Sequence, residues 1–473
     1  MKNLTVDKLY QPRGLYVLFF LEMWERFSYW GIQSLLVLYL VRYFLFSDEK
    51  SYTLFGAYTA LTYAISLLGG IIADRFLGFR KSIVFGGILI VLGNIILALP
   101  DKSLLHLGLS LIIGGTGLIK PNSASQLGTL YDKKDTRRDG GFTIFYVGTN
   151  IGGIFGPLAY GFFSTQFGWH TAFIISAVGV VIGLAVYLFY GSLFKKSSHE
   201  NQITFWTILF LYLVLIGLLW LLLLNPEWVG RLLDWIELFT LAGFLYFIYQ
   251  GNATEKRAII AIFFMVCFSL FFFACLFQCS TSLLLFIERF VDRQLFNWIV
   301  PTETFVSLQP FFLVLLAPLL AKIWARLKTY EPSASKKIVI GLLFASASFV
   351  CFMLAALEVT ETKKAGLSWI LTGNILLSLG ELCIAPPALA TITQLAPVKL
   401  QATLVGSFYL ALAFAGYLAS LIAKLTAPVI AGTPLKTTAP YFSVYQSIFY
   451  LAIAAAVLAY VMSYYWHRIY KVL

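Results

Sequence analysis

Runs of about 20 apolar residues recur along the whole chain, and this feature constrains its fold more than any other. Each run is long enough to cross a lipid bilayer as an α-helix. Only 12% of the residues are Asp, Glu, Lys or Arg, about half the share in a typical soluble domain. The sequence therefore predicts an all-α membrane protein with fourteen transmembrane helices, at residues 13–44, 52–74, 81–99, 104–131, 140–165, 169–194, 202–224, 229–250, 256–288, 302–328, 336–357, 366–394, 401–427 and 441–470.

Two polar connectors, at residues 191–202 and 249–257, set the seventh and eighth predicted helices apart from the rest. No long soluble segment interrupts the other helices. We therefore expect three parts: an N-terminal six-helix bundle at 13–194, an inserted transmembrane hairpin with its connectors at 195–255, and a C-terminal six-helix bundle at 256–470.

The 34 Lys and Arg residues concentrate in the loops and termini on one side of the predicted helices. This asymmetry marks the cytoplasmic side, and it predicts a multi-pass protein of the plasma (inner) membrane with both termini in the cytoplasm. Although the net charge is +12, no Lys- and Arg-rich arm with interleaved aromatic residues occurs, so a nucleic-acid partner is not expected. The five cysteines lie in apolar segments without a CxxC pair, so we expect neither a metal nor another cofactor.

The stretch LEMWERFSYWG, residues 21–31, places three charges inside the first apolar run. Charges at membrane depth are costly, and they normally face a bundle interior or an aqueous cavity on a transport pathway. A buried ion pair that only fixes helix packing is the alternative. At about 100° per residue, one face of this helix carries a single polar stripe, formed by Glu22, Glu25, Arg26, Tyr29 and Gln33.

Two carboxylates are too many for a single arginine, and Lys120, in the stretch GGTGLIKPN, can supply a second cation. Burial makes a carboxylate easier to protonate, whereas nearby cations make it harder. A glutamate in this setting is expected to take up a proton near neutral pH, which leaves one cation free to receive an anionic substrate. The predicted proton-coupling residues are thus Glu22, Glu25, Arg26 and Lys120.

Several stretches resemble the proton-dependent oligopeptide transporter family of the major facilitator superfamily. ExxERF followed by SYWG resembles the family's first-helix motif, and GGIIADRFLGFRK (69–81) resembles its loop motif. GTGLIKPN (115–122) resembles the family's fourth core helix, and FTIFYVGTNIGGIFGP (142–157) resembles its fifth. GELCIAPPALATITQLAP (380–397) resembles its tenth core helix. The resemblance covers nearly the whole chain, and the motifs occur in the family's order.

The resemblance implies two six-helix bundles with an inserted hairpin, and proton-driven uptake of di- and tripeptides by alternating access. It implies a substrate site near the membrane midplane where the two repeats meet. We expect a functional monomer in contact with lipid. Arg26 and Lys120 would bind the peptide carboxylate, while Glu381, helped by Asn150, would bind its ammonium group. The other implied pocket residues are Tyr29, Gln33, Tyr63, Phe273, Phe277 and Gln309.

Three positions depart from the family pattern. Gln33 stands where many members have an arginine, and Phe277 where they have the glutamate that pairs with it in an outer gate. Losing both partners costs less than leaving one charge unpaired, so we expect an apolar contact through Phe277. Gln309 replaces an asparagine, and its extra methylene is expected to change the preferred peptide length or amine-bearing substrate.

Asp74 and Arg75 belong to the loop motif. We expect Asp74 to pair with a neighbouring helix end and to affect switching between conformations. An effect on helix packing alone is the alternative.

Other functions are weighed against peptide transport. A proton-coupled transporter of another small solute, such as an amino acid, nitrate or a peptide-like metabolite, is the main alternative, because of Gln309 and the altered seventh core helix. A membrane-embedded enzyme lacks support, since no HExxH, GxSxG or Walker lysine motif occurs. Buried ion pairs and paired bundles favour a carrier over a channel.

Overall fold

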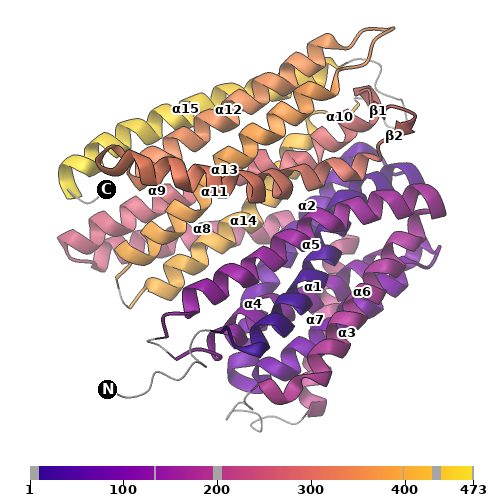
Figure 1. Cartoon of the computed structure of the whole chain (residues 1–473), viewed down its shortest axis with the longest axis horizontal. Coiled ribbons are helices and arrows are strands. Elements are labelled where there is room, and N and C mark those ends of the chain that lie inside the picture. Colours follow the sequence, from indigo (N-terminus) through magenta and orange to yellow (C-terminus); the bar gives the residue numbers. More distant parts are fainter. Residues whose placement is uncertain (1–9, 133–134, 195–204, 398, 429–437, 471–473) are drawn as a thin grey trace. The chain divides into compact units, whose positions relative to one another are not determined.

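The computed structural model describes residues 10–132, 135–194, 205–397, 399–428 and 438–470. These residues are almost entirely helical (Figure 1). Part of the connector predicted at 191–202 lies outside the described residues, as do several basic residues that support the predicted orientation: Lys2, Lys8, Lys133, Lys134, Lys195, Lys196 and Lys471.

The helices follow the predicted segments in order. Up to residue 224 they are α1 (Arg13–Leu38), α2 (Asp48–Ile72), α3 (Gly78–Leu97), α4 (Leu105–Gly128), α5 (Arg138–Phe167), α6 (Trp169–Phe189) and α7 (Phe205–Leu224). They continue as α8 (Pro226–Gln250), α9 (Ala253–Leu276), α10 (Ser282–Phe290), α11 (Leu308–Leu327), α12 (Ala334–Glu358), α13 (Leu367–Leu395), α14 (Gln401–Lys424) and α15 (Ala439–Tyr470). Two short strands, β1 (Gln294–Leu295) and β2 (Trp298–Ile299), pair antiparallel. Short π-helical and 3₁₀ segments lie at Tyr39–Tyr43, Ala73–Leu77, Lys102–Leu104, Gly191–Leu193, Phe277–Ser280, Thr302–Ser307 and Lys328–Tyr330.

Among the described residues, eleven helical stretches are long and apolar enough to cross a membrane. One of them, Asp48–Leu97, contains both α2 and α3, and α7 adds a shorter apolar stretch, Leu209–Leu224. α1 has the length of a membrane span, with 26 residues, but it carries the charges of the polar stripe. The chain therefore has the length and composition of a multi-pass membrane protein.

One predicted helix, at 256–288, is interrupted, because the 3₁₀ turn Phe277–Ser280 separates α9 from α10. Gln278 lies in this turn, and its Nε2 donates to the backbone oxygen of Ala419 on α14 at 3.0 Å. Its Oε1 accepts a hydrogen bond from Ser282 Oγ at 2.6 Å. Hydropathy does not predict this break, since the apolar run continues on both sides of the turn.

The chain divides into two compact units. The first comprises Met1–Leu35 and Leu61–Leu224, and the second comprises Leu36–Ala60 and Asn225–Leu473. α1 and α2 each begin in one unit and end in the other, and the inserted hairpin is divided between α7 and α8. The three-part division expected from the sequence stays a prediction.

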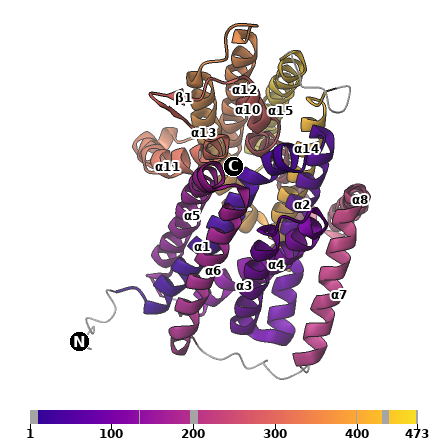
Figure 2. The same cartoon turned by 90° about the vertical axis from the view of Figure 1, so that its right-hand side faces the viewer.

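Within the first unit, α3 packs against α4 and α6 (Figure 2). The close approach of these helices depends on glycine. A Cβ atom on Gly86 of α3 would lie 2.7 Å from the backbone oxygen of Gly115 on α4, and one on Gly69 of α2 would lie 1.9 Å from that of Gly117. Small residues allow membrane helices to approach in this way, so α4 is held tightly against α2 and α3.

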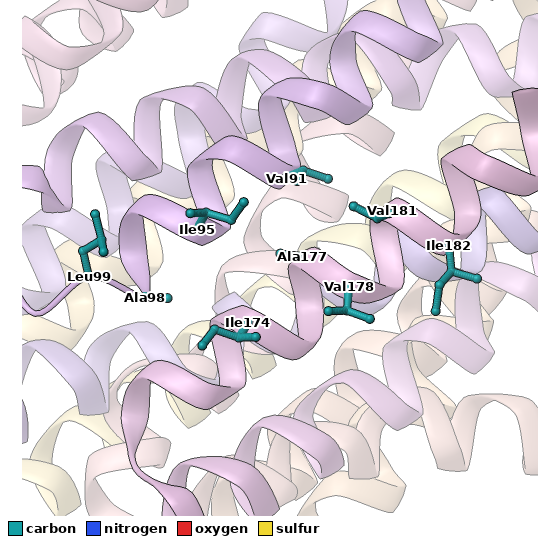
Figure 3. A pocket seen from close by; sticks show the side chains of 9 residues that line it. All are labelled: Val91, Ile95, Ala98, Leu99, Ile174, Ala177, Val178, Val181 and Ile182. Carbon is teal, nitrogen blue, oxygen red and sulfur yellow. The ribbon is translucent and has the colours of Figure 1, made fainter.

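A groove on the first unit lies along α3 and α6 (Figure 3). It is lined by nine aliphatic residues: Val91, Ile95, Ala98, Leu99, Ile174, Ala177, Val178, Val181 and Ile182. These side chains provide neither hydrogen-bonding groups nor charge, so the groove does not suit a polar ligand.

Within the second unit, α12 packs against α13 and α15, and α9 packs against α13 and α14 (Figure 1). The connection between α1 and α2 belongs to this unit as well. A Cβ atom on Gly56 of α2 would lie 2.1 Å from Ser420 Oγ on α14. Arg289 of α10 forms an ion pair with Asp48, so that the start of α2 is fixed to the C-terminal half of the chain.

A second set of charges lies close to this ion pair in the sequence. Glu288 Oε1 is 3.1 Å from Arg42 Nη1, and Glu288 Oε2 is 3.3 Å from Arg293 Nη2. Thr302 Oγ1 donates a hydrogen bond to Glu288. The residues after α1 are therefore fixed to α10 and to the loop that follows it.

Candidate functional site

The polar stripe predicted on α1 forms a buried charge cluster in the first unit. Arg26 Nε donates a hydrogen bond to Glu25 and lies 3.5 Å from Glu22 Oε1. The exposed fractions are 4% for Glu22, 1% for Glu25 and 5% for Arg26. Both carboxylates therefore contact the same guanidinium, away from solvent.

Helix α4 contributes to this cluster through a residue that the sequence analysis missed. Ser123 Oγ donates to Glu22 Oε2 at 2.6 Å. Nearby, Asn122 Nδ2 donates to the backbone oxygen of Gly69 at 3.2 Å, which fixes α4 against α2. Ser123 lies three residues after Lys120, so the motif GTGLIKPN placed it close to the predicted site without indicating its role.

Lys120 lies beside two tyrosine rings, and its predicted role in balancing the two carboxylates stays a prediction. Its Nζ lies 4.0 Å from the ring centre of Tyr63 and 6.0 Å from that of Tyr29. Among the described residues, no carboxylate lies within ion-pair distance of Lys120. Tyrosine rings can stabilise a cation through their π-face. The carboxylates of Glu25 and Glu22 also attract Lys120, at distances longer than an ion-pair contact.

Tyr29 connects the two cations of this cluster. The guanidinium carbon of Arg26 lies 4.9 Å from the Tyr29 ring centre, and the rings of Tyr29 and Tyr63 are 6.3 Å apart at nearly a right angle. Gln33, which is fully buried, donates from Nε2 to the hydroxyl of Tyr29 at 3.1 Å. The structure thus brings Tyr29, Tyr63 and Gln33 together with the charged residues of α1 and α4.

Asn150 lies on α5, which packs closely on α1. A Cβ atom on Gly152 would lie 2.3 Å from the backbone oxygen of Met23, and one on Gly156 would lie 2.5 Å from that of Phe27. Asn150 Nδ2 donates to the backbone oxygen of Tyr146, one turn earlier, at 2.9 Å. Its side-chain oxygen has no hydrogen-bond donor among the described residues.

The predicted ammonium partner, Glu381, lies on α13 in the second unit. Its carboxylate accepts a hydrogen bond from Nε2 of Gln309 on α11. Among the described residues, Glu381 has no ion-pair partner and no other hydrogen bond. Within the described part of the chain, neither Glu381 nor Lys120 therefore forms an ion pair.

Phe273 and Phe277 lie near the break between α9 and α10, and both are buried. The ring of Phe273 packs edge-on against Phe408 of α14, with 6.4 Å between ring centres. Gln33 and Phe277 belong to different units, so the apolar outer contact expected at these positions stays a prediction. Motif reasoning did not find the Arg289–Asp48 ion pair, because its residues lie outside every motif.

Asp74 and Arg75 are exposed in the π-helical segment Ala73–Leu77. Neither residue has an ion pair or a hydrogen bond from its side chain within the described ranges. The predicted role of the pair in switching therefore stays a prediction.

No group of three or more His, Cys, Asp or Glu side chains in the described part of the chain could hold a metal ion. The five cysteines are free.

Comparison with known proteins places this arrangement in a family. The model of the POT family matches residues 80–437. The chain is 32% identical to the dipeptide and tripeptide permease A of Erwinia pyrifoliae, over 97% of this chain and 94% of that protein. It is 31% identical to the protein of the same name from Escherichia coli, over 98% of this chain and 93% of that protein.

Solved structures give the same result. A crystal structure of a peptide transporter POT in complex with sulfate has a TM-score of 0.84 and 28% identity, covering 96% of this chain and 94% of that chain. A POT family transporter in complex with 5-aminolevulinic acid has a TM-score of 0.82 and 27% identity, covering 96% of each chain.

These likenesses extend over almost the full length of the chain, and the family model alone matches well over half of it. They confirm the predicted all-α membrane fold of the major facilitator superfamily. They also confirm the family that the sequence motifs indicate. The chain therefore belongs to the POT family, and it is a membrane-spanning transporter rather than an enzyme.

Proposed function

We propose that the chain takes up di- and tripeptides together with protons, by alternating access. The observation that carries this proposal is that Lys120 and Glu381 form no ion pair with any described residue. A short peptide is a zwitterion, and it supplies the carboxylate that Lys120 lacks and the ammonium group that Glu381 lacks. The curated relatives named above as dipeptide and tripeptide permeases support the same substrate class.

The carboxylate end of the peptide binds Lys120 and Arg26 in this proposal. Lys120 is the primary partner, because Arg26 already contacts Glu22 and Glu25. The rings of Tyr29 and Tyr63 hold the Lys120 ammonium in place. A charged group desolvated in this way gains more from an incoming anion than an exposed lysine would.

The ammonium end of the peptide binds Glu381, with Asn150 as a further polar contact and Gln309 beside the Glu381 carboxylate. Phe273, Phe277 and Gln33 contact the rest of the peptide. The relative that binds 5-aminolevulinic acid supports a site of this kind, since that ligand also carries an amine at one end and a carboxylate at the other.

Proton coupling follows from the charges around Arg26. Glu22 and Glu25 together carry two negative charges against one guanidinium, and a proton taken up by either carboxyl removes the excess. Arg26 then has one fewer negative partner and can contribute to binding the substrate carboxylate. The membrane potential adds about 2.3 kcal/mol per charge for each 100 mV, so that proton entry can drive accumulation.

In this proposal the protein lies in the inner membrane with both termini in the cytoplasm, works as a monomer surrounded by lipid, and needs no cofactor beyond the proton gradient. Asp74 and Arg75 then lie at the cytoplasmic ends of α2 and α3, where they affect the rate of switching. The excess of basic residues on that side supports this orientation.

Uptake of labelled Ala-Ala into proteoliposomes with an inward proton gradient tests the proposal. Wild-type protein should accumulate the dipeptide, and Glu22→Gln, Glu25→Gln and Lys120→Ala should lose gradient-driven accumulation. Glu381→Gln should mainly weaken affinity for substrates with a free amine. Glu361→Gln, in an exposed loop, is the matched control. Accumulation at the wild-type level in every variant would refute the assignment.

A further inference from the structure

We propose that Gln309 occupies the ammonium site in the unloaded protein and competes with the substrate for Glu381. Its side-chain amide thereby sets how tightly amine-bearing substrates bind. This inference rests on the proposed function, since it takes Glu381 as the partner of the substrate ammonium. It reverses the simpler view in which Gln309 only adds a contact to the peptide.

The first observation is that the Glu381 carboxylate already has a donor. Gln309 Nε2 donates to Oε2 of Glu381, and the described residues supply no other hydrogen bond to this carboxylate. Gln309 is 6% exposed, whereas Glu381 is only partly buried. The carboxylate is therefore both occupied and within reach of a ligand.

The second observation is that the position of Gln309 is fixed. Ser378, one turn before Glu381 on α13, donates from Oγ to the backbone oxygen of Gln309 at 3.1 Å. The following residue, Pro310, is buried and has a fixed φ. Because the start of α11 is anchored to α13, a side chain shorter by one methylene cannot move closer to recover the contact.

The chemistry of the two donors explains the competition. A carboxylate only accepts hydrogen bonds, and a neutral amide gives it a weaker partner than an ammonium group does. An ammonium group that takes the place of the Gln309 amide at Oε2 must displace that amide or share the oxygen with it. Part of the attraction between ammonium and carboxylate is therefore spent on replacing an existing hydrogen bond. A substrate without an ammonium group has no such exchange to make.

Two dipeptides that differ only at the amine test the proposal. Dissociation constants for Ala-Ala and N-acetyl-Ala-Ala are measured by calorimetry on purified protein, without a proton gradient. Gln309→Asn should tighten binding of Ala-Ala by about tenfold and leave N-acetyl-Ala-Ala within about twofold of wild type. In a Glu381→Gln background the same substitution should no longer affect Ala-Ala, because its target is absent.

The control is Gln401→Asn, the same change at an exposed position on α14, which should leave both constants unchanged. Weaker binding of Ala-Ala by Gln309→Asn would show that Gln309 binds the substrate instead of competing with it. Equal changes for the two dipeptides would show an effect of pocket shape. No change for either would show that the Gln309 amide is energetically irrelevant. Each of these three results overturns the proposal.

The proposed function is tested separately by gradient-driven uptake of wild-type protein. If wild type binds Ala-Ala but does not accumulate it, the transport proposal fails. The ratio of the dissociation constants for Ala-Ala and N-acetyl-Ala-Ala still decides the role of Gln309. If wild type accumulates Ala-Ala and the ratio does not change in Gln309→Asn, only the inference about Gln309 fails. If wild type binds neither dipeptide, both fail.

Discussion

Arg289 and Asp48 form a two-point ion pair, with 2.6 Å from Nη1 to Oδ2 and 2.7 Å from Nη2 to Oδ1. The residues are 241 positions apart in the sequence. The hydroxyl of Tyr441 lies 3.5 Å from Nη1 of the same arginine, and Asp48 is 5% exposed. The start of α2 is thus held by α10 through paired hydrogen bonds that are mostly protected from water, the strongest geometry for such a pair.

Breaking this ion pair should destabilise the protein. Asp48→Asn keeps the size of the side chain and removes its charge, so Arg289 loses its anionic partner. We expect a loss of about 1–3 kcal/mol, measured as a lower midpoint of thermal or denaturant unfolding in detergent. Glu49→Gln, at the exposed neighbouring position, should have almost no effect.

The exchanged pair, Asp48→Arg with Arg289→Asp, should recover part of the lost stability. Each single charge reversal should destabilise the protein more than Asp48→Asn does, because it brings two like charges together. Equal stabilities for the single reversals and the exchanged pair would contradict a direct interaction.

Lys120 should contribute to peptide affinity through its charge. Lys120→Met keeps most of the apolar side chain against Tyr63, and it should weaken Ala-Ala binding by about 2 kcal/mol or more. Lys120→Arg keeps the charge and should retain part of the affinity. A dipeptide with an amidated C-terminus is the control ligand, because it has no carboxylate that could contact Lys120. If Lys120→Met weakens both ligands equally, the charge is not what binds.

Ser123 should shift the pH dependence of uptake. Its hydroxyl stabilises the charged form of Glu22, so Ser123→Ala makes the carboxyl easier to protonate. Uptake driven by protonation falls as the pH rises. The pH at which uptake is half-maximal should therefore be higher in Ser123→Ala, by about 0.5–1 pH unit. Ser125→Ala is the matched control, because that hydroxyl bonds only to its own helix, at the oxygen of Pro121. A downward shift for Ser123→Ala would contradict the assigned role of this hydroxyl.

Glycine should be essential where α5 contacts α1. Gly152→Ala places a methyl group against the backbone oxygen of Met23, which cannot move aside as a side chain can, and we expect a loss of about 1–3 kcal/mol of stability. Gly217→Ala on α7 is the control, since nothing lies within 4 Å of its Cβ position. That change should be neutral or stabilise by up to about 1 kcal/mol. Melting temperatures of the two variants in the same detergent decide the comparison.

Much of the fold could be predicted because bilayer thickness and hydropathy leave few alternatives for a chain of this kind. The polar stripe on α1 was predictable for a related reason. Three charges inside an apolar run must share a face, and the helical period places Glu22, Glu25 and Arg26 together. The charge balance then indicated Lys120 as a second cation, and the family resemblance indicated a substrate-binding role for Glu381.

What the sequence did not predict depends on contacts between distant segments. The charge balance indicated Lys120 as a partner of the carboxylates, but only the position of α4 directs its ammonium toward Tyr63. The hydrogen bond from Ser123 depends on the same placement. The break at Gln278 depends on a backbone oxygen of α14, at Ala419, which is far away in the sequence. The packing of the helices decides which side chains and backbone groups contact each other, and hydropathy and residue spacing do not predict that packing.

The sharing of α1 and α2 between the two units has a mechanical consequence. Neither unit is joined to the other there by a slack linker, because unbroken helix passes from Leu35 to Leu36 and from Ala60 to Leu61. The chain is therefore as stiff at these two boundaries as in the rest of each helix, because every peptide group there is held by hydrogen bonds between residues four positions apart.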